Sequence, residues 1–163
     1  FPGNCHFKFN CNKICYNIKN IPNFVDDMNN TRFSTAIHIL TLLADSGENW
    51  MNSDWIAGSI NTNAAMVRKE LSALQDAGFV IGRKGKEGGS RLNKPSSQIS
   101  LADIYVAVKN TEVLGKKNLN TNPQCPVGKQ INKELDQLYS DTDQLVINSL
   151  KGLTLENFAK KFR

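Results

Sequence analysis

Seven cationic side chains gather in one short stretch of this chain, and the chemistry that suits them is phosphate binding. Residues 68–94 hold seven lysines and arginines but only three acidic residues. The formal net charge of all 163 residues is +5, so most of the positive excess lies in this segment. A basic patch confined to one element predicts a polyanionic partner, held by contacts that weaken as salt rises. The alternative is a solvated helix with ordinary surface lysines. The cations are Arg68, Lys69, Arg83, Lys84, Lys86, Arg91 and Lys94.

A helix and a β-hairpin must position these cations. Apolar residues at helical spacing predict a helix with one face on a core, and they are Met66, Val67, Leu71, Leu74 and Ala77. Gly78 stands where a helix commonly ends in a residue of positive φ. Residues 79–81 predict a strand, glycines at 85, 88 and 89 a tight turn, and residues 91–92 a returning strand. This order resembles the recognition helix and wing of a winged helix-turn-helix, whose usual partner is DNA.

Two further helices precede this unit. A broad apolar face predicts a helix over 32–44, formed by Phe33, Ala36, Ile37, Ile39, Leu40, Leu43 and Ala44. Ser53 is expected to cap a short helix through residue 60, with Trp55, Ile56 and Ile60 facing inward. Residues 61–63 predict a tight turn, and Asn63 is a good N-cap for the next helix. A short helix, a brief turn and a longer helix have helix-turn-helix spacing.

The C-terminal part predicts a short helix, a loop and a long helix. Ser100 is expected to cap a helix through residue 108, and 111–126 is expected to be a loop. Residues 127–150 carry a seam with a period of 3.5 residues, typical of a coiled coil: Val127, Ile131, Leu135, Leu138, Thr142, Leu145 and Ser149. We expect this seam to form a homodimer, with packing onto its own domain as the alternative. Gly152 is expected to end or bend this helix, and residues 155–162 to form an amphipathic tail helix.

The predicted fold class is mainly α with a small β-hairpin wing: a winged helix-turn-helix domain followed by a long C-terminal dimerisation helix. The expected organisation is an N-terminal extension at 1–27, a DNA-binding domain at 28–110, a loop at 111–126, and the dimerisation helix with its tail helix at 127–163. Residues 1–27 differ in composition from the rest and hold three of the four cysteines. We therefore expect Met28 to be the natural start, and the extension to be non-native or disordered.

No transmembrane helix is expected, because the sequence contains no run of about 18 apolar residues. The start of the chain has no charged segment followed by an apolar one, so no secretory signal is predicted. An apolar share of 40% is enough for the core of one compact domain. We expect a cytoplasmic protein.

The cysteines offer two further kinds of chemistry. Cys5, His6, Cys11 and Cys15 have a spacing that fits no common structural zinc pattern, so we predict no metal site. Cys125 begins the long helix, where the helix dipole and Lys129 would favour a thiolate. It is a candidate redox sensor, and the alternative is a tolerated cysteine that fixes the entry of the helix. No second cysteine within 28–163 is available as a resolving partner.

An enzyme is not predicted. The two histidines are His6 and His38, and His38 lies among apolar neighbours of a helix. The sequence shows no nucleotide-binding glycine loop after a strand and no Ser/His/Asp arrangement. We assign no catalytic residue.

The order of several motifs resembles a known family. The segments VRKELSALQDAGFV, GKEGGSRLNKP, ISLADIYVAV and CPVGKQINKELDQL follow one another as in the Rrf-two family of bacterial winged-helix transcriptional regulators, relatives of IscR, NsrR and CymR. The resemblance covers residues 28–163 and implies a DNA-binding regulator. It also implies a homodimer, a repressor by analogy, and the cluster-lacking branch. Cluster-binding members carry three close cysteines where this chain has only Cys125, so no cofactor is expected.

The resemblance also implies how DNA would be held. The start of the second helix would enter the major groove, with Thr62, Asn63, Ala64 and Ala65 nearest the bases and an A·T-rich half-site. Arg68 and Lys69 would reach bases or backbone. The wing residues Arg83, Lys84, Lys86 and Arg91 would follow phosphates or enter the minor groove. Arg32 and Ser53 would add phosphate contacts at helix N-termini.

The predicted function is a sequence-specific regulator that acts as a homodimer on an inverted-repeat operator in double-stranded DNA. The predicted dimer contacts are Val127, Ile131, Leu135, Leu138 and Leu145. A small-molecule or redox effector is the further partner considered. The alternatives are a thiol-based redox regulator acting through Cys125, and a winged-helix module that binds proteins instead of DNA.

Overall fold

Six α-helices and one β-hairpin make up the described part of the chain. The computed structural model describes residues 31–85, 88–110 and 112–163. The predicted N-terminal extension at 1–27 therefore lies outside the described residues. The helices are α1 Thr31–Asp45, α2 Ser53–Ile60, α3 Ala64–Asp76, α4 Leu101–Val108, α5 Pro126–Lys151 and α6 Leu155–Ala159, with 3-10 turns at Ser96–Gln98 and Lys160–Phe162. The strands are β1 Val80–Arg83 and β2 Gly89–Leu92. The predicted class, mainly α with a small hairpin, is confirmed.

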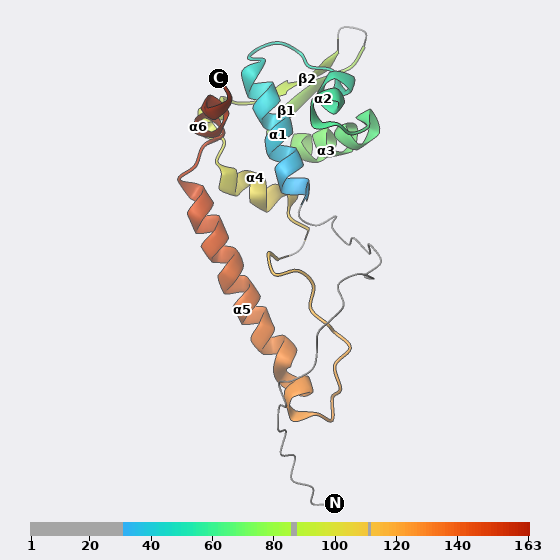
Figure 1. Cartoon of the computed structure of the whole chain (residues 1–163), viewed down its shortest axis with the longest axis vertical. Helices are drawn as coiled ribbons and strands as arrows, with labels where there is room; N and C mark the ends of the chain where they lie inside the picture. Colours follow the sequence, from blue (N-terminus) through green and yellow to red (C-terminus); the bar gives the residue numbers. More distant parts are fainter. Residues whose placement is uncertain (1–30, 86–87, 111) are drawn as a thin grey trace, which may run out of the picture.

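Helix α1 lies at the centre of the core. Its residues Ala36, Ile39, Leu40 and Leu43 are fully buried. They share one cluster with buried residues of α2, α3, α4 and α6: Ile56, Val67, Leu71, Leu74, Ile104 and Leu155. Figure 1 shows α1 between the helix-turn-helix pair α2–α3 and the C-terminal α6. The predicted inward face of α1 is confirmed. On α3 the prediction is wrong at Met66, which is 42% exposed, and at the C-cap residue Ala77, which is also exposed.

Four of the helices begin with a side-chain N-cap that accepts hydrogen bonds from backbone N–H groups of the following turn. The capping residues are Asn52, Asn63, Ser100 and Thr154. The caps predicted at Asn63 and Ser100 are confirmed. The cap predicted at Ser53 is wrong, because the Asn52 side chain accepts from the Trp55 backbone N–H at 2.7 Å and Ser53 is already helical.

The orientation predicted for Trp55 is also wrong. This side chain is 53% exposed, because α2 buries only Ile56 and Ala57 against the rest of the protein. A helix of eight residues presents a single narrow buried face, and Trp55 lies off it.

The wing is an antiparallel hairpin joined to the loop before α2. Val80 pairs with Leu92 and Arg83 with Gly89, and Gly78 adopts a φ of +76° between α3 and β1. Met51 extends this sheet, since its N–H donates to Ser90 O at 3.0 Å and its carbonyl accepts from Ser90 N–H at 2.8 Å. A Cβ at Gly89 would lie 2.6 Å from Met51 O, so this approach requires glycine.

Helix α5 projects from the winged domain as a long rod (Figure 1). It has 26 residues, it ends at Gly152 as predicted, and its one buried residue is Asp143. Along the predicted seam Val127, Leu138 and Leu145 are exposed by 66%, 54% and 70%. The segment 112–125 contains no helix or strand and runs back beside α5, held by Thr121 Oγ1, which donates to Gly128 O at 2.7 Å.

Beyond α5 the chain returns to the core. The Leu155 N–H donates to Ile99 O at 2.9 Å, and the Leu101 N–H donates to Leu153 O at 2.8 Å. Of the helices in the described part of the chain, none combines the length and apolarity that a bilayer crossing requires.

Candidate nucleic-acid interface

The leading end of α3 presents small and polar side chains to solvent. Thr62, Asn63 and Ala65 are exposed and Ala64 is half-buried. The Asn63 carboxamide oxygen accepts from the Met66 N–H at 2.9 Å, which satisfies one of the free donors at the helix start. Capping is therefore an observed role of Asn63, while its contact with a base stays a prediction.

Arg68 links α3 to the start of α2. Its Nη1 donates to the Ser53 hydroxyl at 3.0 Å, so the structure brings together two of the predicted DNA-binding residues. Arg68 and its neighbour Lys69 are both exposed, one turn beyond the start of α3. A guanidinium that binds a neutral hydroxyl keeps its full positive charge, so it remains suited to an anion.

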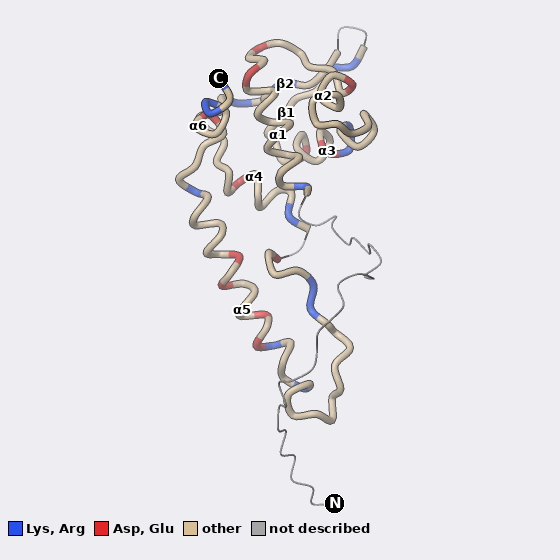
Figure 2. Tube along the Cα trace, in the orientation of Figure 1, with Lys and Arg blue, Asp and Glu red and all other residues tan. Residues whose placement is uncertain are grey.

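The wing cations that the structure describes lie in two different environments. Arg83 and Lys84 are exposed at the end of β1, and Figure 2 shows basic residues in blue at this end of the hairpin. Arg91 is half-buried on β2 and forms an ion pair with Glu48. Lys86 lies outside the described residues. The structure therefore groups Arg83 and Lys84 with α3 and gives Arg91 a carboxylate partner.

A cleft of about 300 Å³ separates α3 from the wing. Of the residues that the structure describes, it is lined by Ser53, Arg68, Leu71, Ser72, Gln75, Gly82, Arg83, Lys84, Gly89 and Ser90, which include three cations and no carboxylate. Cations, hydroxyls and close backbone are the groups that hold phosphate oxygens in protein–DNA complexes. The cleft is suited to a phosphodiester group.

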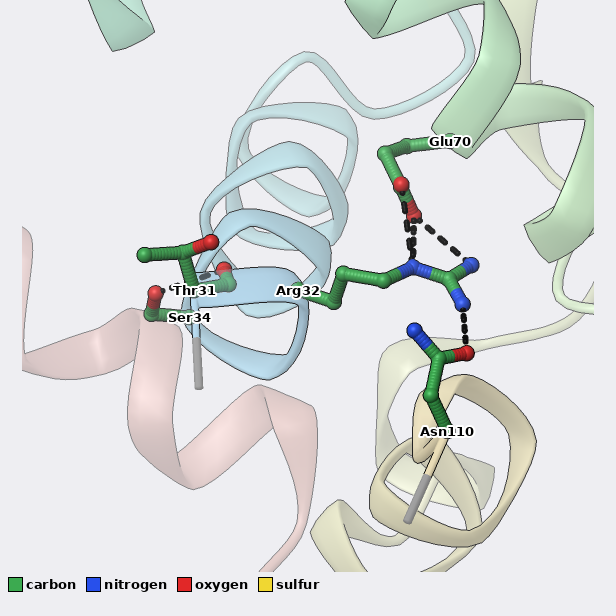
Figure 3. A network of polar contacts seen from close by, with 5 residues as sticks. All are labelled: Thr31, Arg32, Ser34, Glu70 and Asn110. Carbon is green, nitrogen blue, oxygen red and sulfur yellow. Dashed lines mark hydrogen bonds and ion pairs between the residues drawn. The ribbon is translucent and has the colours of Figure 1, made fainter. Parts of the chain in front are cut away.

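Arg32 lies apart from this cleft. Figure 3 shows its guanidinium against Glu70 of α3, with Nε to Oε1 at 3.1 Å and Nη2 to Oε2 at 3.2 Å. The remaining Nη1 donates to the side chain of Asn110, just after α4. Glu70 is only 5% exposed, so this pair fixes α3 to the start of α1. The predicted phosphate contact of Arg32 stays a prediction, and the observed role of the residue is internal.

A second buried carboxylate joins α5 to the winged domain. Asp143 accepts from the Tyr105 hydroxyl at 3.0 Å, from the Val113 N–H at 2.8 Å and from Lys109. Burial and the hydrogen bond to Asp143 raise the pKa of Tyr105 to about 12. Burial alone would raise the pKa of Asp143, but the bonds from Lys109, Val113 and Tyr105 outweigh burial and hold this pKa below its usual value.

Neither of the two reactive side chains considered forms a catalytic arrangement in the described residues. Cys125 is an exposed free thiol at the N-cap of α5, and its side chain makes no capping hydrogen bond. His38 is exposed on α1, with a ring nitrogen 3.4 Å from the Ser59 hydroxyl. The candidate zinc ligands Cys5, His6, Cys11 and Cys15 lie outside the described residues.

Three structural positions were missed from the sequence. Glu70 lies three residues after Val67 and four before Leu74, so its spacing placed it on the buried face of α3. That signal was available. Asp143 and Trp50 owe their positions to contacts with distant segments, and no local sequence pattern predicts these contacts. The Trp50 ring lies against the wing arginines.

Comparison with known proteins identifies the family. The Rrf2 family model, described as an iron-dependent transcriptional regulator, matches residues 29–161. A candidate HTH-type transcriptional regulator of Bacillus subtilis, YwnA, is 38% identical over 130 residues, which span 80% of this chain and 96% of YwnA.

The described residues do not fit the iron of the family description. Iron–sulphur clusters are held by several cysteine thiolates, and Cys125 is the free cysteine of these residues. Within the same ranges no group of three or more His, Cys, Asp or Glu is placed to hold a metal ion. No part of DNA binding is therefore assigned to iron.

Solved structures agree in fold. A crystal structure of a candidate DNA-binding protein is 33% identical with a TM-score of 0.61, and the match covers 78% of this chain and 97% of that one. CymR of Bacillus subtilis, the global cysteine regulator, is 23% identical with a TM-score of 0.59, covering 80% and 95%. The chain therefore belongs to the Rrf2 family, and it is a DNA-binding transcriptional regulator of winged-helix fold and not an enzyme.

Proposed function

We propose that this regulator recognises a specific duplex sequence through α3 and the wing. The start of α3, residues 62–65, enters the major groove, and Arg68, Lys69 and the wing cations hold the flanking phosphates. The observation that carries this proposal is the cleft between α3 and β1, bordered by Arg68, Arg83 and Lys84 and, among the described residues, by no acidic side chain.

The proposed active form is a homodimer paired through α5. Val127, Leu138 and Leu145 of the predicted seam are exposed and support this, because an apolar seam on a helix is stable only when it is covered, while Ile131 and Leu135 are half-buried. Twofold pairing presents two recognition helices about one helical turn of DNA apart, so the operator is an inverted repeat. Occupying such a site would repress the adjacent genes. A regulator acts where the chromosome lies, and the proposed location is the cytoplasm.

The test is DNA binding at several salt concentrations. Genomic fragments retained by the protein supply a specific duplex, and a random duplex serves as reference. Arg68→Ala and Arg83→Ala should weaken binding to both duplexes and reduce the salt slope by about one each. Lys116→Ala, an exposed cation in the loop beside α5, is the matched control and should behave as wild type. Unchanged affinity of both arginine variants at every salt concentration would overturn the proposed interface.

An oxidation signal at Cys125 is the second candidate, favoured by the exposure of this thiol at the start of α5. Peroxide would oxidise the Cys125 thiolate to a sulfenic acid, and the peroxide would be reduced to water. The sulfenic acid would be a new polar group at the start of the proposed dimerisation helix. Loss of DNA binding after mild peroxide treatment in wild type, but not in Cys125→Ser, would support this candidate. Equal responses of the two proteins would exclude it.

A further inference from the structure

The indole ring of Trp50 lies beneath two arginines of the wing. The guanidinium carbon of Arg83 is 5.4 Å from the ring centroid, and that of Arg91 is 5.0 Å from it. Both distances lie within the range of about 6 Å in which a cation is attracted to an aromatic face. One side chain from the loop before α2 therefore contacts cations of both wing strands.

The register of the hairpin explains why these arginines meet one ring. Ile81 pairs with Arg91, and Arg83 follows Ile81 by two residues, so all three point to the same face of the hairpin. The intervening Gly82 points to the other face, where a Cβ would meet the Gln75 side chain of α3 at 3.2 Å. Trp50 thus covers the face of the wing that α3 does not.

The two arginines differ in their carboxylate partners. Arg91 forms an ion pair with Glu48, two residues before Trp50. For Arg83, no ion pair forms within the part of the chain that the structure describes. The residue is exposed, and it also borders the α3 cleft. Among the described residues, the Arg83 guanidinium thus contacts the Trp50 ring and no carboxylate.

The position of the ring is itself fixed. Met51, the next residue, exchanges two backbone hydrogen bonds with Ser90 of β2, at 3.0 Å and 2.8 Å. Asn52 then caps α2. The backbone on the C-terminal side of Trp50 is therefore tied to both the wing and the helix-turn-helix.

We infer that Trp50 is a positioning residue of the DNA interface, which holds Arg83 in place for a phosphate. An arginine resting on an aromatic face keeps its N–H groups available for a phosphate oxygen. Ordering the side chain before DNA arrives reduces the conformational entropy that binding would otherwise cost. The inference rests on the proposed function, since it assumes that Arg83 contacts DNA.

The test compares ring-bearing and ringless variants of the full chain on a random-sequence duplex. Trp50→Leu should weaken binding about threefold to tenfold, and Trp50→Phe should retain most of the affinity, because phenylalanine still offers an aromatic face. In an Arg83→Ala background, Trp50→Leu should have little further effect. If Trp50→Leu binds as tightly as wild type, or more tightly because the ring had withdrawn Arg83 from DNA, the inference is overturned.

A second measurement avoids any dependence on the folding of Trp50→Leu. In a Trp55→Phe background Trp50 is the single tryptophan of the chain. Replacing it by 5-fluorotryptophan weakens the negative face of the ring and leaves its shape almost unchanged. DNA affinity should fall, and this loss should disappear when Arg83 is also alanine. Equal affinity of the fluorinated and natural proteins would contradict the inference.

The outcomes also separate the two proposals. If Arg83→Ala alone leaves DNA binding unchanged, the proposed contact of the wing fails, and the role of Trp50 fails with it. If Arg83→Ala weakens binding but neither the ringless nor the fluorinated ring does, the proposed function stands and the inference about Trp50 is wrong.

Discussion

At the scale of single residues, buried ion pairs join the helices of this protein, and Glu70 is the clearest case. Its carboxylate is buried on α3 against Arg32. Removing it leaves a partly buried guanidinium without its carboxylate partner, at a cost typical of lost charged hydrogen bonds.

We expect Glu70→Ala to lower the free energy of unfolding by about 1–3 kcal/mol, measured by urea denaturation. Glu134→Ala, which removes an exposed carboxylate of α5, is the control and should change stability little. A Glu70 variant as stable as the control would show that the Arg32 pair contributes nothing to the fold.

The lowered pKa of Asp143 predicts that the folded protein loses stability in acid. Its pKa is lowered in the folded chain, so the folded protein binds fewer protons there than the unfolded one. Its contribution to stability is therefore present at neutral pH and is lost as the pH falls below about 4. Asp143→Asn should reduce stability at pH 7 and flatten the dependence of stability on pH in the acid range. Asp141→Asn, an exposed neighbour, should keep the wild-type slope.

Asn63, at the start of α3, has an observed role as a helix cap and a predicted role as a base contact. As an N-cap it satisfies a backbone N–H, and Asn63→Ala should cost about 1 kcal/mol of stability. Asn63→Ser retains a capping oxygen but removes the carboxamide that would read an adenine.

If Asn63 contacts a base, the serine variant should keep its stability and lose affinity for the specific duplex but not for the random one. Thermal unfolding and DNA binding measured on the same samples distinguish the two roles. Equal specificity of Asn63→Ser and wild type would leave Asn63 as a cap alone.

Features that depend on neighbouring residues could be predicted from the sequence, and features that depend on distant segments could not. The helix 53–60, the cap at Ser100 and the end of α3 at Gly78 depend on neighbouring residues, and all three are confirmed. Asn52 displaced Ser53 as the cap because both residues are suitable cap formers and only the backbone geometry distinguishes them.

The wrong orientation predicted for Trp55 and the failure to predict the contacts of Trp50 have the same cause. Whether a tryptophan is buried depends on which distant segment lies against it, and the loop before α2 meets β2, some forty residues later, through Met51 and Ser90. In the candidate site, Arg68 and the exposed start of α3 follow from helical spacing. The pairings of Arg32 with Glu70 and of Lys109 with Asp143 span 38 and 34 residues, beyond any sequence period.

At the scale of the whole molecule, the exposed seam of α5 predicts the oligomeric state. Leu138→Glu with Leu145→Glu places two charges on the apolar surface and should convert the dimer into a monomer in sedimentation experiments. Affinity for an inverted repeat should then fall far more than affinity for a single half-site. Gln144→Glu is the control for added charge on α5, and it should remain dimeric. A wild-type protein that sediments as a monomer would contradict the proposed pairing.

Helix α6 packs against α1 although the two are far apart in the sequence. Leu155 of α6 is fully buried in the cluster around α1, and its backbone bonds to Ile99, just before α4. A fragment cut after α4 would leave the apolar side chains around α1 uncovered, so the winged domain cannot complete its core without α6. During synthesis, this core therefore closes only after α5 and α6 have been made, although both follow the hairpin in the sequence.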